Sequence, residues 1–164
     1  MAQELTNKKQ SLDKKRYNRL APFYDQFESP MELFNYSRWR KKLRQYLPRK
    51  GTILEVGVGT GKNLPFYNRN QRIVAVDVSE KMLQRAKNKK SISEVNLVQM
   101  DVEELGFPDK VFDAVLSTYV FCSVENPIRG LREIGRVLKN DSVVVFLEHM
   151  RSEIELIGRG LWMF

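Results

Sequence analysis

The sequence predicts an α/β fold, in which one open sheet of five mainly parallel strands is flanked by helices. From Gly51 onward, short runs rich in β-branched residues alternate with helical patterns, as in domains built on a parallel sheet. The runs are nearly continuously apolar, as expected of strands covered on both faces. The chain has 164 residues, of which 42% are hydrophobic and 29% charged, so it can form one core and stay soluble.

Five strands and two helices are predicted within residues 51–150, which we interpret as one domain. The strands are residues 52–56, 72–77, 96–101, 112–118 and 142–148. One helix spans residues 80–90 behind Ser79 as its N-cap, and the other spans residues 127–139 with Pro127 at its first position. The second helix carries an apolar stripe that is predicted to pack on the sheet: Ile128, Leu131, Ile134 and Leu138.

The two ends of the chain differ from this pattern. Residues 1–50 contain two helix-compatible stretches, 8–20 and 31–46, separated by breaks at Pro22 and Pro30, and we expect them to form a basic helical cover or lid over the domain. Residues 151–164 have the pattern of the start of a helix and end in a bulky apolar tail. We expect that this tail either marks a truncated product or packs on a membrane or on a second copy of the chain.

Positive charge is concentrated at the N-terminus. Residues 1–50 hold 13 Lys and Arg against 5 Asp and Glu, whereas residues 51–164 hold 15 of each, so the formal net charge of +8 comes from the first segment. A segment of this kind attracts anionic lipid headgroups or nucleic acid. A solvated helical face with no partner is the alternative.

Cysteine and histidine content limits the chemistry. Cys122 and His149 are the only residues of their types, which excludes a disulfide scaffold, disfavours a zinc site and leads us to expect no metal. Cys122 is expected to be a small buried hydrophobe. The N-terminus does not resemble a secretory signal, and no apolar run approaches the roughly 20 residues that span a bilayer. A cytoplasmic location is expected, with peripheral membrane attachment through residues 1–50.

A glycine-rich loop follows the first predicted strand directly. Gly57, Gly59 and Gly61 alternate with other residues, which lets the backbone turn sharply and approach a ligand closely. The dinucleotide fingerprint requires a different glycine spacing, and the phosphate-binding loop requires Ser or Thr after Gly-Lys, where this chain has Asn63. The loop therefore predicts a nucleoside cofactor, and a tight turn without a ligand is the alternative.

Two acidic residues lie at the ends of the next two predicted strands. Asp77 could accept hydrogen bonds from both hydroxyls of a ribose, and Asp101 with the backbone of Val102 could bind an adenine ring. Alternatively, Asp77 caps the next helix and Asp101 is a plain turn residue. Because ligands bind at the carboxyl ends of strands in open α/β sheets, the joint placement favours a binding site.

The ordered series of motifs resembles the class I S-adenosylmethionine-dependent methyltransferases. The matching segments are EVGVGTG (55–61), VDVSEKML (76–83), MDVEELGFP (100–108) and FDAVLST (112–118). Within that class, FCSVENP (121–127), FLEH (146–149) and RLAPFYD (19–25) resemble the small-molecule and lipid branch, which includes enzymes like phosphatidylethanolamine N-methyltransferase and those of ubiquinone and menaquinone biosynthesis. The resemblance implies a Rossmann-like sheet with S-adenosyl-L-methionine as cofactor, bound by residues 51–150.

The resemblance also implies a role for individual residues. Gly57, Gly59 and Gly61 would bracket the methionine part of the cofactor, with Glu55 holding its amino end through the loop. The ribose would lie on Asp77 and Val78, and the adenine on Asp101 and Val102. Further cofactor or acceptor contacts would come from the loop after the fourth strand and from the lid: Ser117, Tyr119 and Tyr24.

The resemblance has three departures, one of which is the bulky apolar tail at residues 161–164. Members usually have Pro-Gly-Gly before the fifth strand, where this chain has Asn140-Asp141-Ser142, and Asn tolerates a left-handed turn. Most members also have two further C-terminal strands, which we expect this chain to lack. The departures put substrate binding and sheet completion in question, since the missing strands would cover the sheet edge.

The expected reaction is an in-line methyl transfer to a small molecule or lipid headgroup. An amine or phenol acceptor must lose a proton, for which His149 is the candidate, with a structural histidine as the alternative. Tyr119 could hold a methylammonium or sulfonium by cation–π contact, or simply pack in the core.

Three rival functions stay open. A non-catalytic cofactor-binding or scaffold protein fits the missing strands. A nucleic-acid methyltransferase fits the basic segment, but Ser117-Thr118-Tyr119-Val120 stands where base-modifying enzymes have an Asn/Asp-Pro-Pro-Tyr/Phe tetrapeptide. An oxidoreductase is disfavoured by the glycine spacing.

Overall fold

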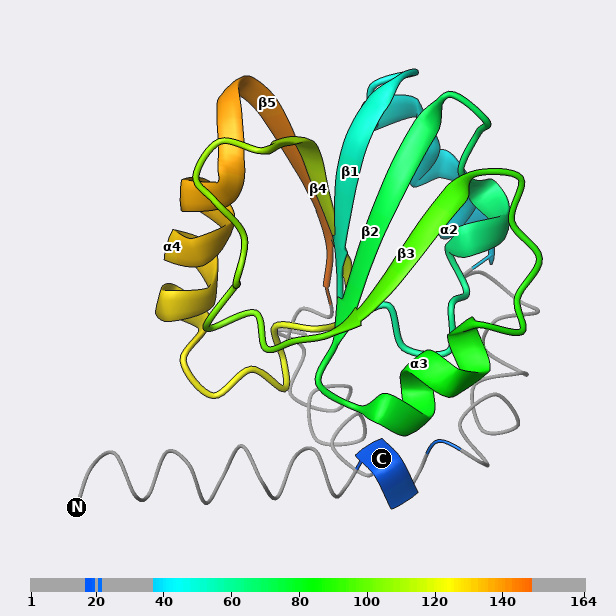
Figure 1. The fold of residues 1–164 in the computed structure, drawn as a ribbon, viewed down its shortest axis with the longest axis horizontal. Helices are drawn as coiled ribbons and strands as arrows, with labels where there is room; N and C mark the ends of the chain where they lie inside the picture. The colour runs from blue at the N-terminus through cyan, green and yellow to red at the C-terminus, as the bar shows by residue number, and fades with distance from the viewer. Residues whose placement is uncertain (1–16, 20, 22–36, 149–164) are drawn as a thin grey trace, which may run out of the picture.

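The computed structural model describes residues 17–19, 21 and 37–148. Its centre is a five-stranded sheet in the order β3-β2-β1-β4-β5, in which every neighbouring pair is parallel (Figure 1). The strands are β1 (Gly51–Val56), β2 (Gln71–Asp77), β3 (Glu94–Gln99), β4 (Phe112–Thr118) and β5 (Leu138–Leu147). The predicted open α/β sheet is confirmed, and because all strands are parallel, their carboxyl ends lie at one edge.

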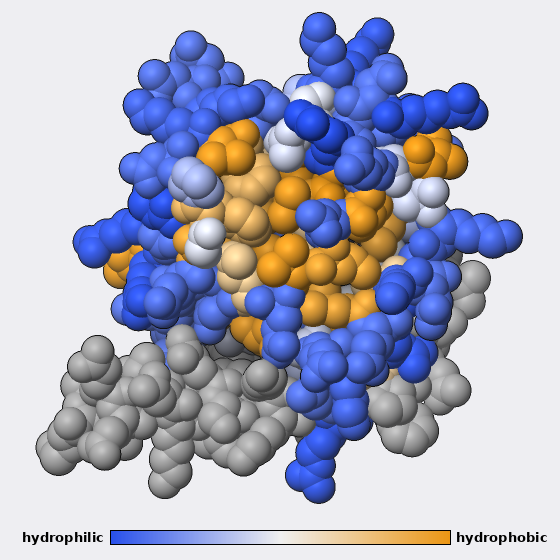
Figure 2. All heavy atoms as spheres, viewed as in Figure 1, coloured by the Kyte–Doolittle hydropathy of each residue, from blue (hydrophilic) through white to orange (hydrophobic). Residues whose placement is uncertain are grey.

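Helices cover the two faces of the sheet separately. On one face, α2 (Ser37–Leu43), α3 (Glu80–Ala86) and the 3-10 turn η3 (Leu64–Phe66) contribute to one hydrophobic cluster, and α4 (Pro127–Val137) contributes to another on the opposite face. A second 3-10 turn, η2 (Arg44–Tyr46), continues α2. Figure 1 shows α4 and α2 on opposite sides of the sheet, and Figure 2 shows apolar side chains gathered in the middle of the molecule within a hydrophilic rim.

The strand β3 and the helix α3 differ in extent from their predictions. β3 spans residues 94–99 instead of 96–101, because its register places Gln99 beside Asp77, where β2 ends. The residues of β3 are either exposed or half-buried, as expected at a sheet edge. α3 ends at Ala86 instead of residue 90, although Ser79 caps its start as predicted by accepting from the backbone N–H of Met82 at 3.2 Å.

The strand β5 begins four residues earlier than predicted, directly after α4. Leu138 already pairs with Phe112, and an irregularity in the ladder precedes the regular pairing that resumes at Val143. The left-handed turn falls on Asp141, with φ of 60°, and not on Asn140. Aspartate tolerates this conformation for the same reason as asparagine, since its short polar side chain bonds locally.

The buried face of α4 is rotated from the predicted one. Ile134 and Leu138 are buried as predicted, but Ile128 and Leu131 are 62% and 47% exposed. Gly130 lies on the buried face instead, where an added Cβ would lie 3.4 Å from the ring of Phe121. The buried residues of the helix are therefore Gly130, Ile134 and Val137.

The remaining predictions about the chain ends lie outside the described residues. These are most of the N-terminal lid, the helix expected after residue 150 and the absence of two further strands beyond it. Within the part of the chain that the structure describes, no helix has the length and apolar character needed to cross a bilayer.

Candidate active site

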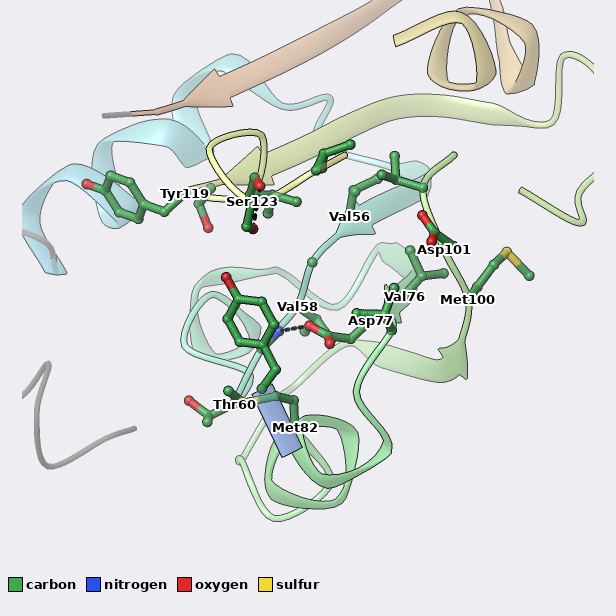
Figure 3. Close-up of a pocket in the computed structure, with 18 of the residues that line it drawn as sticks. Val56, Val58, Thr60, Val76, Asp77, Met82, Met100, Asp101, Tyr119 and Ser123 are labelled. Atoms are coloured by element: carbon green, nitrogen blue, oxygen red, sulfur yellow. Dashed lines mark hydrogen bonds between the residues drawn. The ribbon is translucent and has the colours of Figure 1, made fainter. Parts of the chain in front are cut away.

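A cavity lies at the carboxyl edge of the sheet, where β1, β2 and β4 end and the segment after β3 begins (Figure 3). Five short segments line it: residues 56–60, 76–78, 100–103, 118–120 and 123–125. Tyr17, Arg40, Lys62 and Met82 complete the wall. The cavity therefore combines segments that are far apart in the sequence and are brought together by the sheet order.

The glycine loop presents bare backbone to this cavity. Gly57 and Gly59 line it with φ of 65° and 54°, a conformation that side chains rarely adopt. At Gly57 an added Cβ would lie 2.3 Å from Cγ2 of Val120, so the loop after β4 packs directly on this glycine. At Gly59 an added Cβ would meet nothing within 4 Å, and there the positive φ alone requires glycine.

Asp77 joins the glycine loop to the start of α3. Its Oδ2 accepts from the backbone N–H of Gly59 at 2.9 Å (Figure 3), and its Oδ1 accepts from that of Ser79 at 2.8 Å. Burial raises the pKa of Asp77, and the two hydrogen bonds oppose that shift. Each carboxylate oxygen has a further lone pair, so Asp77 can accept from a ligand while it holds both loops.

The segment after β3 supplies two further carboxyl groups. Asp101 lines the cavity and forms a turn by accepting from the backbone N–H of Glu103 at 2.9 Å. Glu103 is 2% exposed, and its Oε1 accepts from the N–H of Asn126 at 2.8 Å. Its Oε2 is buried without a hydrogen-bond partner among the described residues. A buried oxygen of this kind is an acceptor for a donor group of a ligand.

A buried polar network lies behind the glycine loop. The carboxylate of Glu55 accepts from Nδ2 of Asn63 and from the hydroxyl of Tyr67, each at 2.8 Å. Nη1 of Arg40 donates to Oδ1 of Asn63 and to Oγ1 of Thr118, each at 3.0 Å. Because Arg40 belongs to α2, this network ties the N-terminal helix to the ends of β1 and β4.

The network shifts the protonation of its acidic members. Burial raises the pKa of Glu55 to about 7, although hydrogen bonds from Asn63 and Tyr67 and the charge of Arg40 oppose the shift. Burial, and next the neighbouring Glu55, raise the pKa of Tyr67 above its ordinary range. Near neutral pH, the Glu55 carboxyl therefore exchanges between its protonated and ionised forms.

The loop after β4 is held in an unusual conformation. Tyr119 has a left-handed φ of 58°, and its N–H donates to the carbonyl of Leu147 at 2.7 Å. Oε1 of Glu148 accepts from the N–H groups of Val120 and Phe121 at 3.1 and 3.3 Å. The guanidinium of Arg40 lies 5.5 Å from the centre of the Tyr119 ring, which extends toward α2 in Figure 3. Backbone strain of this kind concentrates at binding and catalytic sites.

The structure brings most of the predicted site residues together. Those that line the cavity are Gly57, Gly59, Asp77, Val78, Asp101, Val102 and Tyr119. Glu55, Gly61 and Ser117 are not among the lining residues, and Glu55 and Ser117 are buried behind the wall. Tyr24 and His149 lie outside the described residues. Cys122, which we expected to be buried, is exposed.

Sequence reasoning missed Arg40, Glu103 and Glu148. Arg40 precedes Leu43 and Leu47 at spacings of three and four, and this inward-facing pattern could have placed it against the domain. No local signal identifies Glu103 or Glu148, because their partners lie more than 20 residues away in the sequence.

In this open parallel sheet, β1 ends in a turn of bare backbone, the neighbouring strand β2 ends in a carboxylate, and another carboxylate follows β3. This arrangement defines a nucleoside-binding α/β domain. Among residues 17–19, 21 and 37–148, no cluster of three or more His, Cys, Asp or Glu is placed to hold a metal. The model of one family, the methyltransferase domain, matches residues 54–146, and the chain belongs to this family.

Known proteins of this kind resemble the chain over most of its length. A phosphatidylethanolamine N-methyltransferase of Cereibacter sphaeroides is 39% identical over 111 residues, 64% of this chain and 54% of that protein. A demethylmenaquinone methyltransferase of Bacillus licheniformis is 30% identical over 145 residues, 84% and 62% of the two chains. The chain thus spans 54% to 62% of the length of these relatives.

The fold also matches that of solved methyltransferases. The structure of a SAM-dependent methyltransferase from Aquifex aeolicus has a TM-score of 0.63 to this chain, with 24% identity over 76% of this chain and 73% of that one. Together, family and fold indicate S-adenosylmethionine as the cofactor of the domain.

Proposed function

We propose that the chain is the catalytic part of an S-adenosylmethionine-dependent methyltransferase acting on an amine or phenol of a small molecule or lipid headgroup. One observation carries the proposal: the bare backbone of Gly57 and Gly59 meets the carboxylates of Asp77 and Asp101 in one cavity. The names of the two relatives support a small-molecule or lipid acceptor, since one gives a phospholipid and the other a quinone, and the first name alone specifies an amine.

The charges around the cavity suggest how the cofactor would lie. Asp77, Asp101 and Glu103 belong to the β2 and β3 side, where acceptors suit the ribose hydroxyls and adenine amine. Arg40 and Lys62 are the basic residues of the lining and belong to the β1 and β4 side. They suit the carboxylate of the amino-acid part. The unpartnered Oε2 of Glu103 fits this assignment, because a ligand donor would satisfy it.

Alignment and exclusion of water are what the domain must supply. Gly57, Gly59, Asp77 and Asp101 would hold S-adenosylmethionine, whose sulfonium would supply a methyl group for displacement by the acceptor's lone pair, with S-adenosylhomocysteine as the leaving group. Apolar residues of the wall, including Val56, Val76 and Val102, keep water from the site. We retain His149 as the candidate to take the acceptor's proton and Tyr119 as a residue that positions the acceptor.

Binding measurements test the cofactor assignment. Calorimetric titration is expected to show binding of S-adenosylhomocysteine and none of NAD⁺. Asp77→Asn should weaken binding roughly 10-fold to 100-fold, the loss expected for a hydrogen bond to a charged group. Asp141→Asn, at an exposed carboxylate outside the cavity, is the matched control and should change little. Thermal unfolding of both variants shows whether Asp77→Asn still folds. Binding of NAD⁺ alone would overturn the cofactor assignment.

Transfer of labelled methyl from S-adenosylmethionine tests the acceptor. Incubation with a fractionated lipid and metabolite extract should place label in a small molecule or lipid. Label found only in RNA or DNA would overturn the acceptor class. Cofactor binding without any transfer would favour a non-catalytic domain and contradict the proposed activity.

A further inference from the structure

The segment 37–50, which contains α2 and η2, carries nearly all of the surplus positive charge of the N-terminal region. It has seven Lys and Arg and no Asp or Glu, whereas residues 1–36 have six and five. Against the formal net charge of +8 of the whole chain, this short segment alone contributes +7. Five of the seven basic residues lie in α2 and η2, and Arg49 and Lys50 lie directly before β1, so the charge belongs to this described segment and not to the N-terminus at large.

This segment has two faces. Arg40, Leu43 and Leu47, spaced by three and four residues, are buried against the domain. Trp39, Lys42 and Tyr46 repeat the same spacing on the outside. The outward side chains form what we call the basic–aromatic face: Arg38, Trp39, Lys41, Lys42, Arg44 and Tyr46.

The aromatic members distinguish this face from an ordinary solvated helix. Trp39 and Tyr46 are 49% and 56% exposed, although large rings are usually covered in a folded domain. The ammonium of Lys42 lies 5.6 Å from the centre of the Trp39 ring. Exposed Trp and Tyr beside Lys and Arg match the boundary between lipid headgroups and acyl chains, where the rings insert and the cations meet anionic lipids.

A nucleic acid would also be attracted by the charge, but the rings are poorly arranged for it. Bases bind by stacking on the open face of an aromatic ring. Lys42 already lies over the Trp39 ring, whereas insertion of the ring edge among headgroups leaves that contact intact. The face is also the outer surface of one short helix and its continuing turn.

We propose that the basic–aromatic face docks on the anionic surface of a phospholipid bilayer. The docked segment would present its other face, with Arg40, to the cavity, since Arg40 lines the cavity and contacts Thr118. A bilayer bound to α2 would thus lie next to the β4 side of the cavity, close to Tyr119. The proposal concerns a surface and does not depend on the identity of the methyl acceptor.

Vesicle flotation without cofactor tests the docking. The full chain is expected to float with phosphatidylcholine vesicles that contain phosphatidylglycerol, to stay behind with pure phosphatidylcholine, and to be released by salt. Lys41→Glu with Lys42→Glu should weaken binding by roughly 30-fold or more, at about 1 kcal/mol for each lost lysine. Lys87→Glu with Lys90→Glu makes the same charge change outside the face and should weaken binding far less.

A second readout follows the aromatic ring itself. In a Trp162→Phe background, Trp39 is the remaining tryptophan, and its emission should shift to the blue on adding the anionic vesicles. A thermal unfolding midpoint equal to that of the unchanged chain shows that the Lys41 and Lys42 variant is folded.

Three results would overturn the proposal. The two charge variants could float equally well, or the unchanged chain could bind equally to vesicles with and without phosphatidylglycerol. The chain could also bind an RNA oligonucleotide and fail to bind either type of vesicle. Because no cofactor is present in these assays, their failure leaves the proposed methyl transfer untouched.

Discussion

Replacing Gly57 with alanine is expected to lower the free energy of unfolding by roughly 2–5 kcal/mol, through backbone strain and overpacking together. The backbone of Gly57 has φ of 65°, which costs an L-residue roughly 1–2 kcal/mol. The new Cβ would lie 2.3 Å from Cγ2 and 3.0 Å from Cγ1 of Val120. Val120 must therefore move, and overpacking of this kind costs about 1–3 kcal/mol.

Two other glycines separate the contributions. Gly59→Ala should cost only the backbone part, roughly 1–2 kcal/mol, because an added Cβ there meets nothing within 4 Å. Gly135→Ala lies in α4, where an added Cβ also has open space, and it should stabilise the chain by about 0.5–1 kcal/mol. The three variants make the same chemical change with three different expected outcomes.

Urea denaturation of the three variants and calorimetric titration with S-adenosylhomocysteine provide the measurements. Val120→Ala removes both methyl groups that the Cβ introduced by Gly57→Ala would meet, so the double variant should lose less stability than the two single variants added together. Additive costs, or Gly57→Ala as stable as Gly59→Ala, would refute the close packing of the two loops.

Two predictions concern the buried network. Because Glu55 has a folded pKa of about 7 against an ordinary 4.5, the folded state holds the extra proton between these values, and stability should fall as pH rises from about 5 to 8. Glu55→Gln should flatten this fall in urea midpoints; an unchanged slope would contradict the raised pKa. Arg40→Ala should cost about 2–4 kcal/mol by removing buried charged hydrogen bonds, against at most about 0.5 for exposed Arg38→Ala. Equal denaturation midpoints for these two variants would exclude the network.

The sequence predicted the parts of the fold whose causes are local. β-branched runs gave four of the five strands to within two residues, and Ser79 and Pro127 marked the two helix starts. The glycine spacing and the carboxylates at the end of β2 and after β3 could be recognised because strand, turn and ligand-facing residue follow one another directly in the chain. Parallel strands then bring such turns to one edge.

Interactions between distant segments could not be predicted from the sequence. The amphipathic pattern of α4 suggested a stripe through Ile128 and Leu131, but these side chains lie at the surface, and the helix buries Gly130, Ile134 and Val137 instead. No sequence pattern near Glu148 indicates that its carboxylate accepts from the backbone N–H groups of Phe121 and Val120, which lie 27 and 28 residues earlier.

The chain by itself determined an open parallel sheet and a nucleoside site at its edge. Packing between distant segments, in contrast, brings Arg40 to Asn63 and Thr118 and lets Glu55 support the loop from behind the cavity wall. The physical reason is burial: a charged side chain removed from water must find its partners wherever packing places them, and packing joins residues that the sequence keeps apart.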